Sequence, residues 1–555
     1  MKKSPLLWIL SRVRRRIPAI LVMTLAQVGS ALFSVFFALG FRGVIDGAAS
    51  GNSAEFARAC LIQGGIILGN VICLSLFRHL HDRLQADLER DWKRNLLHGL
   101  LHGDYAEVSS YHSGELLNRL NNDVSRVNDG ILTIVPGAAS MLTRLIAAVT
   151  VLGVLDGRFT LMIAAAGVVV VGVTAIMRKK LKELNKRVSE HDGKVSGFLQ
   201  ETMEKLLMVQ TMDVSQEIER RADTMLNDRY EIQRKRKNIS LLTHTATTVM
   251  FHGAGFFALV WCSARMLMGQ ISFGSLTAVI QLVNQVQQPF ANLSGVMPKY
   301  VSMLASAERL IELEQIQGEP EPISQDPSEM YRKMAYIKAE GMTFAYDRDE
   351  VFSDTEFALP KGAFAVITGA SGIGKSTLLK LLLGVFRPNS GRLHLEGPDY
   401  DLTLDRSTRR LFSYVPQGNL LLSGSLRENL TIVKPQATEE EIRQALYVSA
   451  MEDYLPQLPK GLDTVLGESG AGLSEGQAQR LAIARAVLGG APVLLLDECT
   501  SALDADTERK VLQRLKALPD RTFISVTHRP AAIQLCDWRL EVENGKIRSV
   551  AVEQK

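Results

Sequence analysis

A glycine-rich stretch in the second half of the chain has the residue types and spacing of a phosphate-binding loop. Residues 363–368 predict a short buried strand, and residues 378–381 begin a helical pattern. Between them stand Gly369, Ala370, Ser371, Gly372, Ile373, Gly374, Lys375, Ser376 and Thr377. Glycines let backbone N–H groups approach phosphate oxygens, and the start of a helix favours anions. Lys375 can reach the β- and γ-phosphates and Ser376 can ligate Mg²⁺, so we expect ATP and Mg²⁺ to bind here.

Two adjacent acids stand where such a loop would need them. Asp497 and Glu498 follow the apolar run 493–496, which predicts a second buried strand. A carboxylate at this place can hold Mg²⁺, and its neighbour can act as general base on the attacking water. Paired acids at a strand end also occur as solvated loop residues, but together with the phosphate loop the catalytic interpretation is favoured.

The sequence from Leu473 to Gln477, Leu-Ser-Glu-Gly-Gln, resembles the signature of the ATP-binding-cassette superfamily, which is usually Leu-Ser-Gly-Gly-Gln. The resemblance covers nearly the whole chain, because further family motifs follow in the expected order. It implies that nucleotide contacts come from Tyr346 as the adenine-stacking aromatic and from Ser474, Gly476, Gln477 and Asp504. It also implies Gln417 as a Mg²⁺ ligand and catalytic residue, and His528 as the switch histidine.

The first three hundred residues are far more apolar than the remainder. A hydrocarbon core of about 30 Å needs roughly 20 apolar residues as helix. Stretches of this length with at most one charged residue are 17–41, 60–77, 131–155, 159–177, 239–264 and 266–298. We therefore expect an all-α transmembrane domain of six spans, followed by an α/β P-loop ATPase domain.

Basic residues predict the orientation of these spans. Arginines precede the first span at 12–16, basic residues follow the fourth at 178–187, and others precede the fifth at 234–237. Since basic loops stay on the cytoplasmic side, the ATPase domain lies there too. We expect a multi-pass protein of the bacterial cytoplasmic membrane, with residues 1–16 as an interfacial helix or, alternatively, a frayed tail.

The expected domains are residues 1–16, the elbow; 17–314, the spans with long cytoplasmic legs; 315–334, a linker; and 335–555, the ATPase. Six spans ahead of one cassette resemble an exporter half-molecule, and coupling segments are expected near 104–111 and 204–213. No peptidase sequence precedes the first span, so we do not expect this chain to process a leader peptide.

The resemblance implies that two cassettes meet head to tail around ATP. We expect a second copy of the chain as partner, or else a homologous half-transporter, because Glu475 departs from the usual signature glycine. An importer built on the exporter fold stays open, as does a nucleotide-gated channel or regulatory subunit of the same architecture.

Polar residues inside the apolar stretches indicate where a solute could bind. Arg144 interrupts the third span, where a charge costs about 2.5–3.5 kcal/mol on insertion scales. Four amides, Gln281, Asn284, Gln285 and Gln288, share one helical face, and His244 and His252 could line the same space. Such a cavity favours a peptide or another hydrophilic or amphiphilic solute, including an anion. The alternatives are helix–helix hydrogen bonds for the amides and a structural pair for Arg144.

Composition excludes several other classes. The net charge of +4 with 22% charged residues argues against a nucleic-acid-binding tail protein and a disordered acidic chain. Five cysteines without a CxxC pair argue against a disulfide scaffold or a zinc site. A soluble cassette ATPase acting on DNA would lack the six apolar spans, so we expect no nucleic-acid partner.

Overall fold

The computed structural model describes residues 4–318, 326–346, 349–418, 421–458, 460–467 and 472–552. The chain forms two compact units, one of residues 1–98 with 113–315 and one of residues 99–112 with 316–555. The first unit is helical and the second combines sheets with helices.

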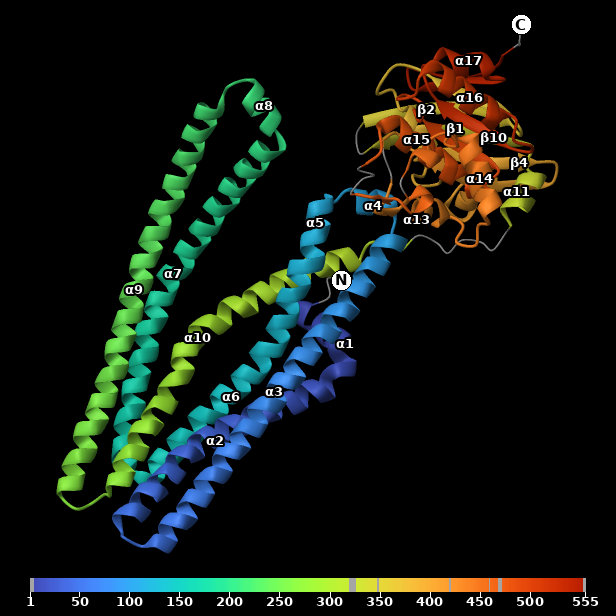
Figure 1. Ribbon diagram of the computed structural model, residues 1–555. Helices are drawn as coiled ribbons and strands as arrows, with labels where there is room; N and C mark the ends of the chain where they lie inside the picture. Colours follow the sequence, from blue (N-terminus) through green and yellow to red (C-terminus); the bar gives the residue numbers. More distant parts are fainter. Residues whose placement is uncertain are drawn as a thin grey trace. The chain divides into compact units, whose positions relative to one another are not determined.

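Long helices build the first unit (Figure 1). In the described residues these are α2 (Ile17–Ala49), α3 (Ser53–His102), α6 (Val124–Leu155), α7 (Gly157–Glu204), α9 (Ser215–Leu267) and α10 (Phe273–Glu314). A short helix, α1 (Pro5–Val13), and a 3₁₀ turn, Arg14–Arg16, precede them. Five of the apolar stretches predicted from the sequence each lie within one of these long helices, whereas the sixth, 266–298, begins at the end of α9 and continues through a turn into α10.

Four stretches of the described residues are long and apolar enough to cross a membrane. They are Pro5–Ala49, Ser53–His102, Ser113–Leu155 and Ser215–Leu267. The helices α7 and α10 contain segments, 169–171, 173–179 and 290–295, whose side chains lie outside the described ones. The number of six crossings therefore stays a prediction.

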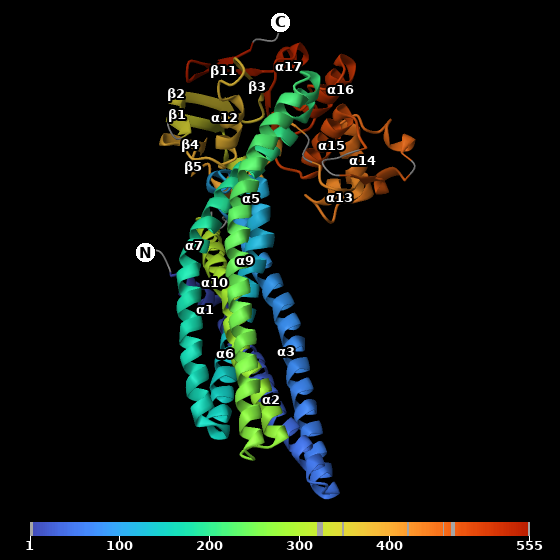
Figure 2. The same ribbon diagram turned by 90° about the vertical axis from the view of Figure 1, so that its left-hand side faces the viewer.

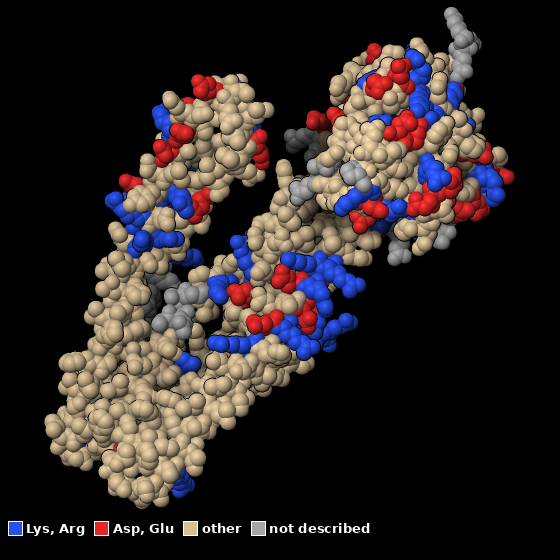
Figure 3. Space-filling model, viewed as in Figure 1, with Lys and Arg blue, Asp and Glu red and all other residues tan. Residues whose placement is uncertain are grey.

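The helices are longer than a bilayer requires. The 50 residues of α3 span about 75 Å at 1.5 Å per residue, against a hydrocarbon core of about 30 Å. Figure 3 shows the corresponding division of this unit, with one end almost free of charged residues and the legs carrying both signs. Helices α7 and α9 run side by side along their length (Figures 1 and 2).

Short helices occupy the turns at which the legs reverse. Helix α4 (Tyr105–Ser109) follows α3, and helix α8 (Leu206–Thr211) lies between α7 and α9. Asp104 caps α4 by accepting hydrogen bonds from the amides of Ala106 and Glu107, at 2.8 and 3.3 Å. Both turns fall in the segments where coupling elements were expected.

The second unit is built on a six-stranded sheet with the order β12-β11-β3-β10-β9-β6. Its strands are β3 (Phe364–Thr368), β6 (Phe412–Val415), β9 (Val493–Asp497), β10 (Thr522–Val526), β11 (Trp538–Glu543) and β12 (Lys546–Ala551). All pairs are parallel except β11 with β12. A four-stranded antiparallel sheet, β2-β1-β4-β5, adds β1 (Tyr336–Tyr346), β2 (Asp349–Pro360), β4 (Ser390–Gly397) and β5 (Tyr400–Thr403).

Alternate side chains of the parallel strands enter two separate cores, as the period of two in a strand requires. Leu494 and Leu496 pack in a core with the helices α14 (Glu439–Val448), α15 (Glu475–Leu488) and α16 (Ala505–Lys516). Leu495 packs on the other face with α12 (Lys375–Leu382) and the antiparallel sheet. Buried on both faces, these strands read as the uninterrupted apolar runs seen in the sequence.

Two segments outside the expected ATPase boundaries are part of this unit. Helix α11 (Pro327–Lys333), within the expected linker, contributes the buried Met330 and Tyr331 to the core. The turn after α3 also belongs here: Gly103 forms a β-bridge with Gly318, and the ring of Tyr105 lies 6.1 Å from that of Phe386. The start of the ATPase domain at residue 335 stays a prediction.

Candidate nucleotide site

The expected catalytic residues gather at one edge of the parallel sheet. The strands β3, β10, β9 and β6 are consecutive neighbours, and Ile367, Val526 and Asp497 are aligned across three of them. Ends of parallel strands meet at the same edge, where open α/β sheets bind ligands. The four loops leaving this edge carry the glycine loop, His528, the pair Asp497–Glu498 and Gln417.

The glycine loop has the backbone that a phosphate cradle requires. Gly374 adopts a φ of +107°, and a Cβ at this position would lie 2.3 Å from Val351. A Cβ on Gly369 would lie 2.6 Å from the carbonyl oxygen of Val542. The ammonium group of Lys375 donates hydrogen bonds to the carbonyls of Gly369 and Ala370, at 2.8 and 2.9 Å. Only 7% of Lys375 is exposed, so its charge is directed into the loop.

The remaining residues of the glycine loop lie in the same turn or in the helix after it. Ala370, Ser371, Gly372 and Ile373 connect β3 to α12, and Ser376 and Thr377 lie in the first turn of α12. The helix therefore presents its amide end beside the loop, which favours negative charge.

Asp497 is a fitting ligand for a divalent cation. Only 2% of it is exposed, its Oδ2 accepts a hydrogen bond from the Tyr414 hydroxyl at 3.2 Å, and its Oδ1 is buried without a partner among the described residues. Burial and the nearby charge of Glu498 raise the pKa of Asp497, although the neighbouring Ser376 and Tyr414 hydroxyls oppose the shift. A buried, unpartnered carboxylate oxygen beside the Ser376 hydroxyl suits Mg²⁺ coordination.

Glu498 and Gln417 are joined directly, the Gln417 amide Nε2 donating to Oε2 of Glu498 at 2.7 Å. Glu498 has a φ of +47°, which is uncommon for a residue with a side chain. Its amide donates to the carbonyl of Val526 at 3.0 Å, so the turn is tied to the neighbouring strand. Strained backbone of this kind often occurs at functional sites.

Tyr346 contacts the first turn of α12, whereas His528 is placed only by the strand that it follows. Tyr346 ends β1, is 40% exposed, and its hydroxyl lies 3.1 Å from the Thr377 hydroxyl. Its ring therefore lies beside the start of α12 and packs edge-to-face against Phe344 and Phe386. His528 follows β10 and is exposed, with no contact recorded to it in the described part of the chain.

The signature residues are organised by a helix cap. Ser474 caps α15: its hydroxyl accepts from the Gln477 amide at 3.3 Å, and Gln477 Oε1 accepts from the Ser474 amide at 2.8 Å. A Cβ on Gly476 would lie 2.9 Å from the carbonyl oxygen of Ala502, so a larger residue would push the next loop away. Asp504 caps α16 by accepting from the Thr507 amide at 2.9 Å.

These signature residues and Asp504 are not brought to the glycine loop of their own chain. Among the described residues, none of the recorded hydrogen bonds or ion pairs of Ser474, Gly476, Gln477 and Asp504 reaches residues 369–377. Glu475, next to the cap, is exposed in the first turn of α15.

Three residues that support the site were not singled out from the sequence. Tyr414 bonds Asp497, Gln479 contacts Ser501 and Ala502 at 3.0 and 3.1 Å, and Arg529 donates to the carbonyl of Leu503 at 2.9 Å. The position of Arg529 directly after the switch histidine was the available signal, but an arginine beside a motif is too common to assign alone.

The expected solute-binding residues lie on α6, α9 and α10 of the helical unit. Arg144 on α6 donates a hydrogen bond to Oε1 of Gln288 on α10, whereas its Nε is buried without a partner among the described residues. Asn284 and Gln288 are exposed, Gln281 is partly exposed, and Oε1 of Gln285 is buried and unpartnered among the described residues.

The histidines of α9 have no recorded contact with that group in the described region. His244 and His252 are exposed, and the only recorded polar contact of His244 in the described region is with Thr248, at 3.4 Å. The adjacent helices enclose an apolar cavity of about 370 Å³ lined by residues that include Met162, Met250, Phe257 and Val283. An apolar space thus lies beside the amide-bearing helix α10.

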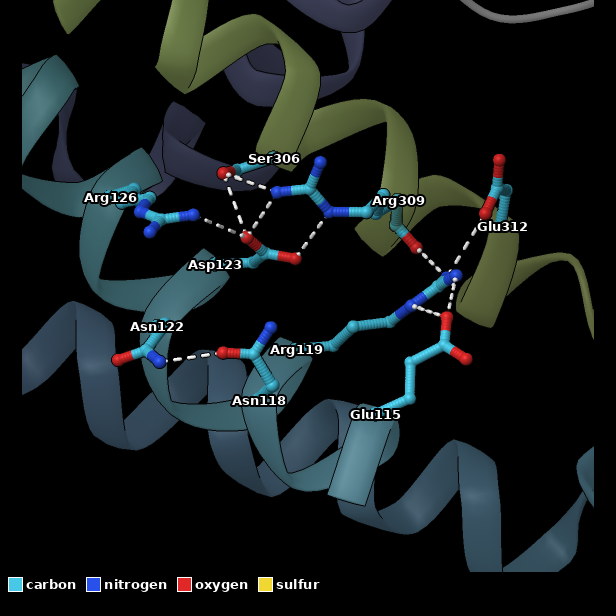
Figure 4. A network of polar contacts seen from close by, with 9 residues as sticks. All are labelled: Glu115, Asn118, Arg119, Asn122, Asp123, Arg126, Ser306, Arg309 and Glu312. Atoms are coloured by element: carbon cyan, nitrogen blue, oxygen red, sulfur yellow. Dashed lines mark hydrogen bonds and ion pairs between the residues drawn. The ribbon is translucent and has the colours of Figure 1, made fainter. Parts of the chain in front are cut away.

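A buried polar network joins the turn that precedes α6 to the second half of α10 (Figure 4). Asp123, completely buried, accepts hydrogen bonds from Arg309 at 2.5 and 2.7 Å and from the Ser306 hydroxyl at 2.9 Å. Arg119 bonds Glu115 at 2.6 Å and Glu312 at 3.0 Å. Residues 119–123 form a π-helical turn, a local widening that often marks functional positions.

Sequence comparison assigns both halves of the chain to known families. Residues 19–290 match the family described as ABC transporter transmembrane region, and residues 352–501 match that described as ABC transporter. An ATP-dependent lipid A-core flippase of Albidiferax ferrireducens is 29% identical over 97% of this chain and 93% of its own length.

Two further comparisons extend over nearly the same region. ABC transporter B family member 1 of Dictyostelium discoideum is 25% identical over all of this chain, which spans 61% of that protein's length. A structure of a bacterial Atm1-family ABC exporter with ATP bound has a TM-score of 0.77, at 23% identity, covering 97% of this chain and 95% of that one.

The fold, the phosphate loop and these comparisons agree with the expectation from the sequence. A helical membrane region followed by one sheet-containing ATPase domain is the organisation of an exporter half-molecule, and the ATPase domain couples ATP hydrolysis to transport. The chain belongs to the ATP-binding cassette transporter family, as an exporter-type half-transporter.

Proposed function

We propose that this chain, as a dimer, exports a solute through a membrane by alternating access, with ATP hydrolysed between two ATPase domains. The main observation behind this proposal is the composition of one edge of the parallel sheet. Lys375, Asp497 and Glu498 lie at this edge, whereas the signature residues have no recorded contact with the glycine loop in the described region. The signature of a second chain would complete the site, because the chain's own signature residues have no recorded contact with its glycine loop in the described region.

Each residue at this edge has a role that its geometry supports. The backbone amides of Gly369 to Thr377 would bind phosphates, and Lys375 would exchange its two carbonyl contacts for phosphate oxygens. Ser376, Asp497 and Gln417 would hold Mg²⁺, which when bound neutralises charge developing on the phosphates. Glu498 would take the proton of the attacking water.

The hydrogen bond from Gln417 orients the carboxylate of Glu498. Tyr346 would stack on adenine, and His528 would contact the γ-phosphate region from the end of β10. Ser474, Gly476, Gln477 and Asp504 would act on nucleotide held by the partner chain.

The proposed partner is a second copy of this chain, because every catalytic residue type is present in it. One observation favours a heterodimer as the second candidate: Glu475 places an exposed carboxylate at the amide end of α15, where phosphate of the partner's nucleotide would approach. Size-exclusion chromatography with light scattering of the purified protein, with ATP, distinguishes a homodimer from a monomer awaiting another chain.

The proposed solute is amphiphilic, or a peptide, and carries an anionic group. The exposed amides of α10 and Arg144 supply polar contacts, and the neighbouring cavity of about 370 Å³ is lined mainly by apolar side chains. A relative named as a lipid A-core flippase supports an amphiphile. Import by the same fold is the alternative direction.

Reconstitution tests the proposal directly. Liposomes that contain the pure protein with its ATPase domain facing outward should accumulate the solute that stimulates ATP hydrolysis. Inside-out vesicles of the bacterial cytoplasmic membrane should accumulate the same solute. ATP hydrolysis without movement of any stimulating compound would remove the transport proposal.

A further inference from the structure

Helix α1 has two contrasting faces. Trp8, Ile9 and Val13 are buried, with 3%, 4% and 2% of their surfaces exposed. Leu7 and Leu10 are 67% and 55% exposed on the other side. One face of the helix is thus fixed to the protein, whereas the other presents large apolar side chains with nothing in the described chain to cover them.

Two arginines continue the exposed face. Arg14 stands four residues after Leu10, and both Arg14 and Arg15 are exposed without a recorded hydrogen bond or ion pair to the described residues. The adjacent Arg16 differs, because it pairs with Asp87 at 3.1 Å and with Asp91 at 3.2 Å. The acids of α3 therefore neutralise one arginine of the turn and leave the other two for a group outside the described chain.

Apolar surface resumes directly beyond these cations. On α2, Ile17, Leu21 and Leu25 are 42%, 58% and 59% exposed and follow one another at four-residue intervals. Arg14 and Arg15 thus interrupt a surface that is otherwise apolar on both sides. Acyl chains cover such apolar surface at the edge of a bilayer, and basic residues at that depth meet anionic headgroups.

The junction is held in place from behind. The indole N–H of Trp8 donates to Glu314 at 2.8 Å, and Arg12 pairs with the same carboxylate at 2.5 Å. The ring of Trp8 also lies 4.9 Å from that of Trp92, in an edge-to-face arrangement. These contacts fix α1 to the last residue of α10 and to α3, so the exposed leucines and arginines form a preorganised surface.

We propose that the junction of α1 and α2 is a binding site for an anionic membrane lipid. Arg14 and Arg15 bind its phosphate, and Leu7, Leu10 and Ile17 contact its acyl chains. The proposal rests on the membrane placement of the chain, and it is independent of which solute the chain transports.

Lipid association can be measured on the full-length protein in phosphatidylcholine vesicles that contain a trace of spin-labelled phosphatidylglycerol or spin-labelled phosphatidylcholine. Electron spin resonance gives the fraction of each lipid that is immobilised by the protein. We expect selectivity for phosphatidylglycerol, and a fall of about fivefold or more in that preference in the double variant R14Q/R15Q, the ratio for about 1 kcal/mol.

Two variants separate a site from general attraction. R14K/R15K keeps the charge and should retain most of the preference. K235Q/K237Q removes two exposed lysines that have no recorded partner in the described residues and precede another span, and it should change the preference little. Equal losses in K235Q/K237Q and R14Q/R15Q would overturn the proposal, as would an unchanged preference in R14Q/R15Q.

Two measurements distinguish a lipid site from misfolding of the variant and from a site for soluble anions. Unchanged basal ATP hydrolysis in R14Q/R15Q shows that the variant is folded, so a lost preference then supports the lipid site. Millimolar inorganic phosphate should displace the labelled lipid no better than chloride at equal ionic strength. Stronger displacement by phosphate would mean a site for soluble anions and would overturn the assignment to lipid.

Discussion

The side-chain amide of Gln417 donates a hydrogen bond of 2.7 Å to the carboxylate of Glu498. The two residues follow neighbouring parallel strands, β6 and β9, so their separation is set by the sheet and not by a flexible loop. A contact between the proposed Mg²⁺ ligand and the proposed general base links nucleotide binding to the orientation of the base.

Replacing Glu498 by Gln should leave ATP binding intact and lower turnover by about 10²- to 10⁴-fold, the usual contribution of a positioned general base. The amide has nearly the same shape but accepts no proton at neutral pH. Nucleotide affinity and steady-state hydrolysis of the purified dimer would both be measured. Glu543→Gln, an exposed acid at the end of β11, is the control. Near-normal hydrolysis in Glu498→Gln would exclude the base role.

His528→Ala should reduce hydrolysis while nucleotide affinity changes by only a few-fold. The imidazole is exposed beyond β10, where it can meet the γ-phosphate, and its removal leaves no buried gap. A titration with a fluorescent ATP analogue, beside a phosphate-release assay, separates the two quantities. A loss of affinity as large as the loss of hydrolysis would assign His528 to ground-state binding.

Glu475→Gly, which restores the usual signature, should raise ATP hydrolysis by the homodimer. Removing the carboxylate from the amide end of α15 removes repulsion against an approaching phosphate. Glu475→Gln distinguishes charge from bulk, since it keeps the side chain. No gain with either variant would show that Glu475 does not limit the homodimer.

Asp123→Asn should lower the unfolding temperature and weaken the response of ATP hydrolysis to solute. Loss of a buried charge partner costs about 3–5 kcal/mol when both groups are fully buried, but Arg309 is 38% exposed, so the effect should be smaller. Arg126→Gln is the control, because Arg126 is more than half exposed and 3.6 Å from Asp123. Equal stability of both variants would contradict a structural role for the network.

The same carboxylate predicts acid sensitivity. Burial would raise the pKa of Asp123, but hydrogen bonds from Arg309 and Ser306 and the charges of Arg309 and Arg126 outweigh burial and lower the pKa below its usual range. Because the pKa of Asp123 is lowered in the folded state, its ionised carboxylate stabilises the protein at pH values above the pKa in the unfolded chain, about 3.9. This stabilisation is lost as the pH falls through the pKa in the folded state. The stability difference between wild type and Asp123→Asn should shrink in that acidic window.

Arg144→Ala should abolish the stimulation of ATP hydrolysis by an anionic solute while basal hydrolysis persists. The guanidinium has one buried nitrogen without a partner in the described region, and its bond to Gln288 leaves further donors for an anion. Arg144→Lys should restore part of the stimulation. Full stimulation of Arg144→Ala by every active solute would exclude recognition of charge at this position.

Periodicity and motif spacing predicted the framework of the protein well. The apolar runs before Gly369 and Asp497 are β3 and β9, and the long apolar stretches of the first three hundred residues lie in long helices. These features depend on local patterns, since a buried parallel strand must be apolar on both faces and a spanning helix must be apolar for about 20 residues.

Contacts between distant residues could not be obtained in this way. Nothing in the local sequence shows that Asp123 meets Arg309, that Tyr414 bonds Asp497, or that Trp8 and Arg12 share Glu314. Each pairing depends on how elements far apart in sequence are packed. Helix α11 was also missed, because its proline and acids resemble a linker until its apolar side chains are seen to be buried.

Residues 99–112 lie between helices of the first unit along the chain, but they belong to the ATPase unit. They contact that unit through Gly103, Asp104 and Tyr105. A fragment cut at the linker would therefore lack a piece of its own surface. In a fragment of residues 316–555 alone, Phe386 would lose its contact with Tyr105, and the backbone of Gly318 would lose its partner Gly103. An ATPase fragment suited to isolation should carry this fourteen-residue peptide, added in trans or fused ahead of it.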